Sequence, residues 1–215
     1  MKNKPLVILH GWSDHAQSFI HLRTQLATRL DLPVHDIILA DYLSLDDTVT
    51  FHDLAAAMHQ AWRHCKLPLT PKSVNMIVHS TGALVCRHWL CHYFRDQLPP
   101  IDHLLMLAPA NFGSFIAHKG RAFLGRLYKG LGHHKPFQVG ELLLQGLELA
   151  SDYTWQLALK DRFSSLNLYH AHGIKTTILI GDQPYHGLAG IIACPGSDGT
   201  VQASSANLNT KMIRG

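Results

Sequence analysis

A serine lies at the junction of an apolar segment and a helix-like segment in Met76-Ile77-Val78-His79-Ser80-Thr81-Gly82-Ala83. Such a junction forms a sharp turn that lifts the serine hydroxyl above the end of a strand. Small residues must follow so that the helix can approach the strand, and Gly82 and Ala83 meet this requirement. The segment therefore predicts that Ser80 is a nucleophile. Val78 departs from the usual G-x-S-x-G pattern, and a serine that only caps the helix remains the simpler alternative.

A second motif, His10-Gly11-Trp12, follows the first apolar segment. Acyl transfer requires stabilisation of a negatively charged oxygen, and two backbone N–H groups aimed at one point provide it. The candidate donors are Thr81, directly after the serine, and Trp12, directly after the His-Gly pair. A His-Gly pair alone carries little information in a chain with 17 histidines, but its place ahead of Ser80 fits an oxyanion hole.

An acidic residue follows in the turn Gly196-Ser197-Asp198-Gly199-Thr200-Val201. A carboxylate is needed to hold a catalytic imidazole in the correct tautomer, and a chain order of serine, acid and histidine is typical of one class of hydrolases. Asp198 is the predicted acid. Asp182, at the end of an apolar segment, is the competing acid, and a plain Asp-Gly turn is the alternative without chemistry.

Strand-like and helix-like segments alternate along the chain, which predicts a mostly parallel sheet with helices on both faces in one α/β domain spanning residues 1–215. The expected strands are Leu6–His10, Asp36–Ala40, Val74–His79, His103–Ala108 and Thr176–Gly181, and the expected helices between them are Ala16–Leu30, Phe51–Cys65 and Gly82–Arg95.

The connection between Ala108 and Thr176 is too long for a simple loop. Within it, Ser114–Leu131 and Val139–Lys160 are expected to be helices. We expect an insertion at about residues 111–165 to form a helical cap over Ser80, with Leu143 and Leu147 on its apolar underside. Ordinary core helices that pack on the sheet are the alternative.

These motifs together resemble the α/β-hydrolase superfamily, in particular bacterial lipase-like hydrolases. The resemblance covers the whole chain and rests on Ile77–Gly82 with Leu84, Val85 and Arg87, on Leu107–Ser114 and on Gly196–Val201. Valine is common in that family at the position of Val78.

The resemblance implies an α/β-hydrolase fold and a serine esterase or lipase that forms an acyl-enzyme on Ser80. It implies a small acyl ester or a lipid as the substrate, and no metal or organic cofactor. A catalytically inactive relative that binds an acyl ligand and an acyltransferase that uses Ser80 are the alternatives.

The histidine of that family follows the acid, but residues 199–215 contain none. We therefore expect a C-terminally shortened chain that lacks the catalytic histidine and the last strand and helix. The alternatives are that His186 has taken over the role or that the protein is not catalytic.

Composition excludes several other classes. With 47% apolar and 16% charged residues the chain is globular, and a net charge of +4 without a dense basic cluster does not indicate nucleic-acid binding. No apolar run reaches the length of a membrane span and no signal peptide is recognisable, which favours a cytoplasmic location. The four cysteines form no CxxC pair, and His88 with His92 lacks a third metal ligand, so buried thiols and no metal site are expected. The oligomeric state stays open.

Overall fold

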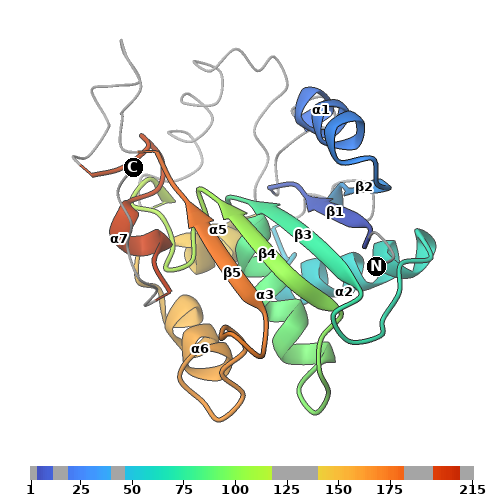
Figure 1. Ribbon diagram of the computed structural model, residues 1–215. Helices are drawn as coiled ribbons and strands as arrows, with labels where there is room; N and C mark the ends of the chain where they lie inside the picture. The colour runs from blue at the N-terminus through green and yellow to red at the C-terminus, as the bar shows by residue number, and fades with distance from the viewer. Residues whose placement is uncertain (1–3, 12–18, 40–46, 118–139, 182–195, 209–215) are drawn as a thin grey trace.

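The structure is a computed structural model that describes residues 4–11, 19–39, 47–117, 140–181 and 196–208 of the 215-residue chain. Its centre is a parallel sheet of five strands in the order β2-β1-β3-β4-β5 (Figure 1). The strands are β1 (Leu6–Leu9), β2 (Val34–Ile37), β3 (Val74–His79), β4 (Ile101–Leu107) and β5 (Lys175–Leu179). Because all five run in the same direction, their carboxyl ends form one edge of the sheet.

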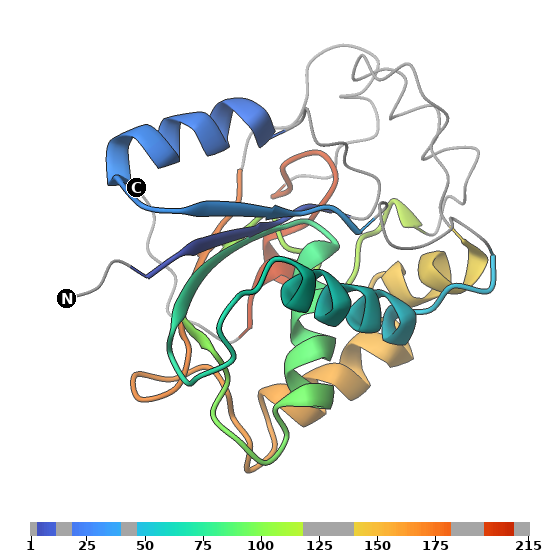
Figure 2. The same ribbon diagram turned by 90° about the vertical axis from the view of Figure 1, so that its right-hand side faces the viewer.

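Helices cover both faces of this sheet, as predicted (Figure 2). One face carries α1 (Ile20–Leu30), and the other carries α2 (Phe51–His64) and α3 (Gly82–Tyr93). The remaining helices are α5 (Glu141–Leu147), α6 (Asp152–Asp161), which packs beside α3, and α7 (Ala203–Ala206). The predicted α/β fold with a mostly parallel sheet is therefore confirmed.

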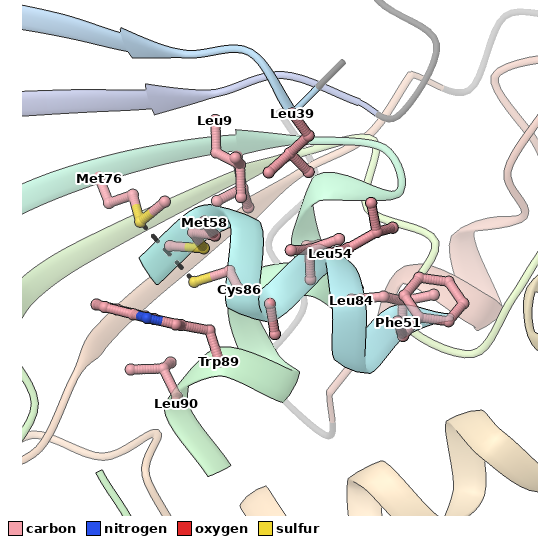
Figure 3. Packing of buried hydrophobic residues seen from close by; sticks show 14 of the residues in the cluster. Leu9, Leu39, Phe51, Leu54, Met58, Met76, Leu84, Cys86, Trp89 and Leu90 are labelled. Atoms are coloured by element: carbon pink, nitrogen blue, oxygen red, sulfur yellow. Dashed lines mark hydrogen bonds between the residues drawn. The ribbon is translucent and has the colours of Figure 1, made fainter. Parts of the chain in front are cut away.

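The main hydrophobic core lies between the sheet and the pair α2 and α3 (Figure 3). Leu54 and Met58 of α2 and Trp89 of α3 are fully buried there, and the rings of Trp62 and Trp89 lie 4.8 Å apart. A smaller cluster around Ile8 and other sheet residues lies under α1. Burial of the large side chains between α2 and α3 fixes the direction of α3, whose first turn begins immediately after Ser80.

Helix α2 shows how the local sequence sets a boundary. Thr50 and Asp53 form a capping box in which the Asp53 carboxylate accepts a hydrogen bond from the backbone N–H of Thr50 at 2.8 Å. Hydrogen bonds from the Thr50 side chain and then from its backbone lower the pKa of Asp53. A charged carboxylate at the start of the helix also complements the helix dipole.

Three of the expected elements differ most from the structure. Strand β2 ends at Ile37 and does not reach Ala40, since its position is set by pairing with β1, where Leu6 is opposite Val34. Ser114 does not begin an α-helix, because it forms an isolated parallel bridge with Glu148. Residues 118–131 of that expected helix lie outside the described residues.

The single helix expected at Val139–Lys160 is two helices. Glu148 ends α5 with an extended backbone, Ala150 has a φ of +56°, and the Ser151 side chain then accepts a hydrogen bond from the backbone N–H of Thr154 to begin α6. A serine that caps a new helix and a left-handed residue before it interrupt the apolar periodicity that made the segment look continuous.

The leucines assigned to the apolar underside of a cap belong to the main core. Leu143 is 1% and Leu147 is 8% exposed, and Phe51 of α2 stacks on Tyr153 of α6 at 4.5 Å. For residues 141–161 the structure thus favours core helices, the alternative that the sequence left open. The rest of the predicted cap, residues 118–139, lies outside the described residues.

No helix in the described ranges is long and apolar enough to cross a membrane. Cys65, Cys86 and Cys91 are free thiols, of which Cys86 is buried. Cys194 lies outside the described residues.

Candidate active site

Ser80 directly follows β3 and has a φ of +51°, a left-handed backbone that is unfavourable for any residue with a Cβ atom. Three backbone hydrogen bonds hold it there. Its N–H donates to the carbonyl of Leu107 at 3.0 Å, and its carbonyl accepts from Ala83 at 3.2 Å and from Ala110 at 3.3 Å. The half-buried Ser80 hydroxyl makes no hydrogen bond to any described residue. The turn therefore presents, at the carboxyl edge of the sheet, a hydroxyl to which no described residue is hydrogen-bonded.

Gly82 allows α3 to begin close to the sheet. A Cβ atom at this position would lie 2.9 Å from the carbonyl oxygen of His10 and 3.1 Å from that of Leu9. Both oxygens belong to the backbone at the end of β1, so neither moves without distorting a central strand. The requirement for a small residue after the serine, deduced from the sequence, has this physical cause.

Of the two candidate oxyanion donors, Thr81 lies among the described residues and Trp12 does not. Thr81 is the N-cap of α3 with φ −61° and ψ −23°, and its carbonyl accepts hydrogen bonds from Leu84 and Val85. Its backbone N–H therefore lies at the positive end of the helix dipole. Gly11 is buried two residues after the end of β1, and it follows His10, whose carbonyl oxygen lies close to Gly82. Trp12 lies outside the described residues.

Asp198 lies in a tight turn held by its own side chain. Its Oδ1 accepts hydrogen bonds from the backbone N–H of Thr200 at 2.8 Å, from the Thr200 hydroxyl at 2.9 Å and from the backbone N–H of Val201 at 2.7 Å. Its Oδ2 accepts none from the described residues. The carboxylate is thus fixed through one oxygen, and the other oxygen has no partner in the described part of the chain.

Ser80 and Asp198 lie at the same edge of the sheet. The backbone of Ser80 is bonded to Leu107 at the end of β4, and Ala108 is bonded to Leu179 at the end of β5. Asp198 then lies beside Gly181, where an added Cβ would be 3.4 Å from the Asp198 Cβ. Since neighbouring strands are about 4.8 Å apart, two strand spacings, or about 10 Å, separate the two positions across the sheet. An imidazole that bridges a serine and a carboxylate fits this separation. The competing acid, Asp182, and His186 lie outside the described residues.

Two described histidines near Ser80 are engaged elsewhere. The ring of His79 packs against Phe19 at 5.1 Å, on the face of the sheet covered by α1. The ring of His10 is fully buried, with its Nε2 3.4 Å from the Asp36 carboxylate and its centroid 4.8 Å from Phe19. Neither arrangement places an imidazole beside Asp198.

A buried ion pair supports the site, and sequence reasoning missed it. Arg87 of α3 donates to the Asp161 carboxylate at 2.6 Å and 3.0 Å and to the carbonyl of Asn111 at 2.6 Å. Tyr169 donates its hydroxyl to Asp161 at 2.7 Å, and Asn111 donates to the carbonyl of Ala206 at 2.8 Å. Burial opposes the charge of Arg87, but Asp161 beside it raises the pKa overall.

This network joins α3, which begins two residues after Ser80, to the segment after β4 and to α7, next to the Asp198 turn. The only signal in the sequence is an arginine among the apolar residues of a buried helix. Its partner Asp161 is 74 residues away and cannot be identified from spacing.

The histidine pair His88 and His92 acquires a neighbour, His52 of α2, with ring centroids 5.7 Å and 4.8 Å away. Nevertheless, no group of three or more His, Cys, Asp or Glu side chains in the described part of the chain could hold a metal ion.

Comparison with solved structures places this architecture in a known class. Phospholipase PlaB from Legionella pneumophila is 30% identical with a TM-score of 0.76, over 95% of this chain and 45% of that one. Lipase BlEst2 from Bacillus licheniformis in its mature form is 17% identical with a TM-score of 0.67, over 96% of this chain and 80% of that one. The metagenomic carboxyl esterase MGS0156 is 15% identical with a TM-score of 0.59, over 94% of this chain and 60% of that one.

The five-stranded parallel sheet, its helices and these similarities define an α/β-hydrolase fold. The chain shares this fold with PlaB, BlEst2 and MGS0156. It spans about half the length of PlaB. No protein-family model matches the sequence, and no curated protein matches it.

Proposed function

We propose that the protein is a serine hydrolase that cleaves carboxylic esters through an acyl-enzyme on Ser80. The observation that carries the proposal is the left-handed backbone of Ser80, at a φ of +51°. This conformation costs about 1–2 kcal/mol for a residue with a Cβ atom, and strained residues of this kind concentrate at functional sites. A helix cap does not require it, because an N-cap residue ordinarily has an extended backbone.

In the proposed reaction the Ser80 hydroxyl attacks the acyl carbon and the alcohol leaves. Water then hydrolyses the acyl-enzyme and regenerates the serine. The backbone N–H groups of Thr81 and Trp12 stabilise the negative charge on the acyl oxygen during both steps. The place of Thr81 at the start of α3 supports its role. Trp12 is assigned only because it follows His10-Gly11.

Asp198 is the proposed acid, which orients a histidine and stabilises its protonated form. The three hydrogen bonds to Oδ1 keep the carboxylate in one orientation and leave Oδ2 for an imidazole N–H. Asp182 remains the competing acid.

His186 is the candidate histidine within the chain, and a protein that lacks a catalytic base is the alternative. Without an imidazole the Ser80 hydroxyl is a weak nucleophile. We therefore expect the 215-residue protein to turn over p-nitrophenyl esters at less than about 1 s⁻¹, the low end for ordinary enzymes. A faster rate that His186→Ala abolishes would identify His186 as the base.

The proposed substrates are acyl esters, including lipids. PlaB is a phospholipase, BlEst2 a lipase and MGS0156 a carboxyl esterase, and these are properties of those proteins. Transfer of the acyl group to an alcohol or amine would use the same residues, and product analysis distinguishes the two outcomes.

Labelling with a fluorophosphonate probe, followed by peptide mass mapping, tests the proposal. In a form of the protein that carries the catalytic histidine, the probe should modify Ser80, and Ser80→Ala should abolish the modification. Ser164→Ala is the matched control, because Ser164 is an exposed serine in the turn after α6. Labelling of a different serine that persists in Ser80→Ala would overturn the assignment of the nucleophile.

A further inference from the structure

A groove of about 970 Å³ lies between α3 and α6, away from Ser80. One wall carries His88, Cys91 and Arg95, from α3 and the turn after it, and the other carries Tyr153, Leu157 and Lys160 of α6. Helix α3 begins beside Ser80, and at 1.5 Å per residue Cys91 is about 14 Å along it from Gly82. The groove thus shares no residue with the proposed active site, and its volume is sufficient for a ligand of lipid size.

The floor of the groove and one side of its opening are apolar. Leu157 is 3% exposed at its base, and Leu166 packs against the main core beside it. Helix α6 and the turn after it expose three large apolar side chains at four-residue intervals, Trp155 at 48%, Leu159 at 51% and Phe163 at 51%. Leu159 also lines the groove, so apolar surface continues from its floor to the outside.

The charges at the groove are predominantly positive. Arg95 and Lys160 both line it, and neither forms an ion pair or a side-chain hydrogen bond with another described residue. Asp96 is the one acidic residue among the lining residues, and it is exposed. Asp161, next to Lys160 in sequence, is already paired with Arg87 in the interior. A groove with an apolar floor, two cations and one carboxylate is complementary to a ligand that has an apolar part and a negative charge.

The half-buried imidazole in the groove wall adds no further positive charge. His88 is hydrogen-bonded to the Tyr153 hydroxyl at 3.0 Å. Burial, and then the neighbours His52, His92 and Lys160, lower its pKa to about 4, so it is neutral at pH 7. Arg95 and Lys160 are therefore the permanent cations of the groove at neutral pH.

We propose that this groove binds a single-chain anionic amphiphile of the long-chain fatty acid class. The carboxylate interacts with Arg95 and Lys160, and the acyl chain lies along Leu157, Leu166 and Leu159. The proposal does not rest on the function proposed for Ser80, because binding here requires no catalytic residue.

Isothermal titration calorimetry tests the proposal. Oleate is added, below its critical micelle concentration, to the Ser80→Ala protein. We expect saturable binding of about one oleate at the groove. The double variant Arg95→Ala with Lys160→Ala should bind oleate about tenfold more weakly, since two exposed ion pairs are lost. Oleyl alcohol, which has the chain without the charge, should bind more weakly than oleate and should not distinguish the variant from its parent.

A separate variant tests the predicted contact between the acyl chain and the groove. Leu159→Asn should weaken oleate binding more than octanoate binding, because the shorter chain makes less contact with the groove. Arg29→Ala and Leu30→Asn are matched controls, since both residues are exposed at the end of α1 on the other face of the sheet. All replaced side chains are exposed, and thermal unfolding verifies that each variant is folded.

Three results would overturn the proposal. The first is an absence of saturable oleate binding, and the second is equal affinity in the Arg95 and Lys160 double variant and in the Arg29→Ala control. The third is association only with anionic phospholipid vesicles, without binding of monomeric oleate, which would assign the exposed face of α6 to a membrane surface instead.

Discussion

Replacing Ser80 by glycine should make the protein more stable while it removes the proposed activity. Ser80 has a φ of +51°, which a glycine adopts without the clash of a Cβ atom. The hydroxyl makes no hydrogen bond to a described residue, so its removal breaks none of the described interactions. The backbone bonds to Leu107, Ala83 and Ala110 do not involve the side chain and remain in the variant.

The magnitude is a difference between two opposing effects. Relief of the left-handed strain favours glycine by about 1–2 kcal/mol. The greater freedom of glycine in the unfolded chain opposes this by about 0.4–1 kcal/mol. The net stabilisation is about 1 kcal/mol, which for a chain of this length corresponds to a rise in Tm of about 2–4 °C. Ser80→Ala keeps the strained Cβ atom and should leave Tm nearly unchanged.

Lys66 provides the matched control. It follows α2, is exposed and has a φ of +53°, close to that of Ser80. Lys66→Gly should therefore raise Tm by a similar amount, but it should leave fluorophosphonate labelling at Ser80 intact. Thermal and urea unfolding of the four proteins measure the stabilities. The reasoning is refuted if Ser80→Gly is no more stable than Ser80→Ala while Lys66→Gly is stabilised as expected, since Ser80 would then not be strained.

Three further perturbations follow from the same structure. Gly82→Ala should destabilise the protein by about 1–3 kcal/mol and slow labelling of Ser80, because its Cβ would lie 2.9 Å from the His10 carbonyl oxygen; normal unfolding and labelling would contradict this. Arg87→Ala should cost about 3–5 kcal/mol in urea unfolding, since Asp161 would stay buried without its cation. Arg87→Met combined with Asp161→Leu should recover most of the loss, and a double variant no better than Arg87→Ala would argue against the ion pair as the cause. The pKa of His88 is lowered from 6.5 to about 4, chiefly by burial, so the unfolded chain binds this proton first as the pH falls. Stability from this group is therefore complete above about pH 6.5 and lost toward pH 4, and His88→Gln should have a flatter stability profile over that interval than the parent protein.

Local patterns predict the part of the fold that positions Ser80. The apolar run before the serine predicts β3 with its observed bounds, Val74–His79. A continuous apolar run of this length is typical of a parallel strand that is buried on both faces. The small residue at position 82 has the contact that the elbow requires. The residues that determine these features lie within a few positions of one another, so the features can be predicted from the local sequence.

Features that depend on distant partners are not visible in that way. Strand β2 was expected two residues too late, because pairing with β1 overrides the stronger apolar signal of Ile37–Ala40. At the break between α5 and α6, Glu148 pairs with Ser114, which lies 34 residues away in sequence. The Arg87–Asp161 pair is more distant still, and a single arginine in a helix does not reveal whether it is buried or exposed.

The segment after β4 explains how two candidate residues so far apart in sequence are held at one edge. Ala110 donates to the carbonyl of Ser80, and the hydroxyl of Ser114 donates to the carbonyl of Thr200 within the Asp198 turn. Between them, Asn111 accepts from Arg87 of α3 and donates to Ala206 of α7. The segment of residues 110–114 thus contacts the turn at Ser80, helix α3 and the turn at Asp198. Because most of these bonds are to backbone carbonyls, side-chain changes at the surface of either turn should leave the spacing unchanged, whereas a shift of β4 would move both turns together.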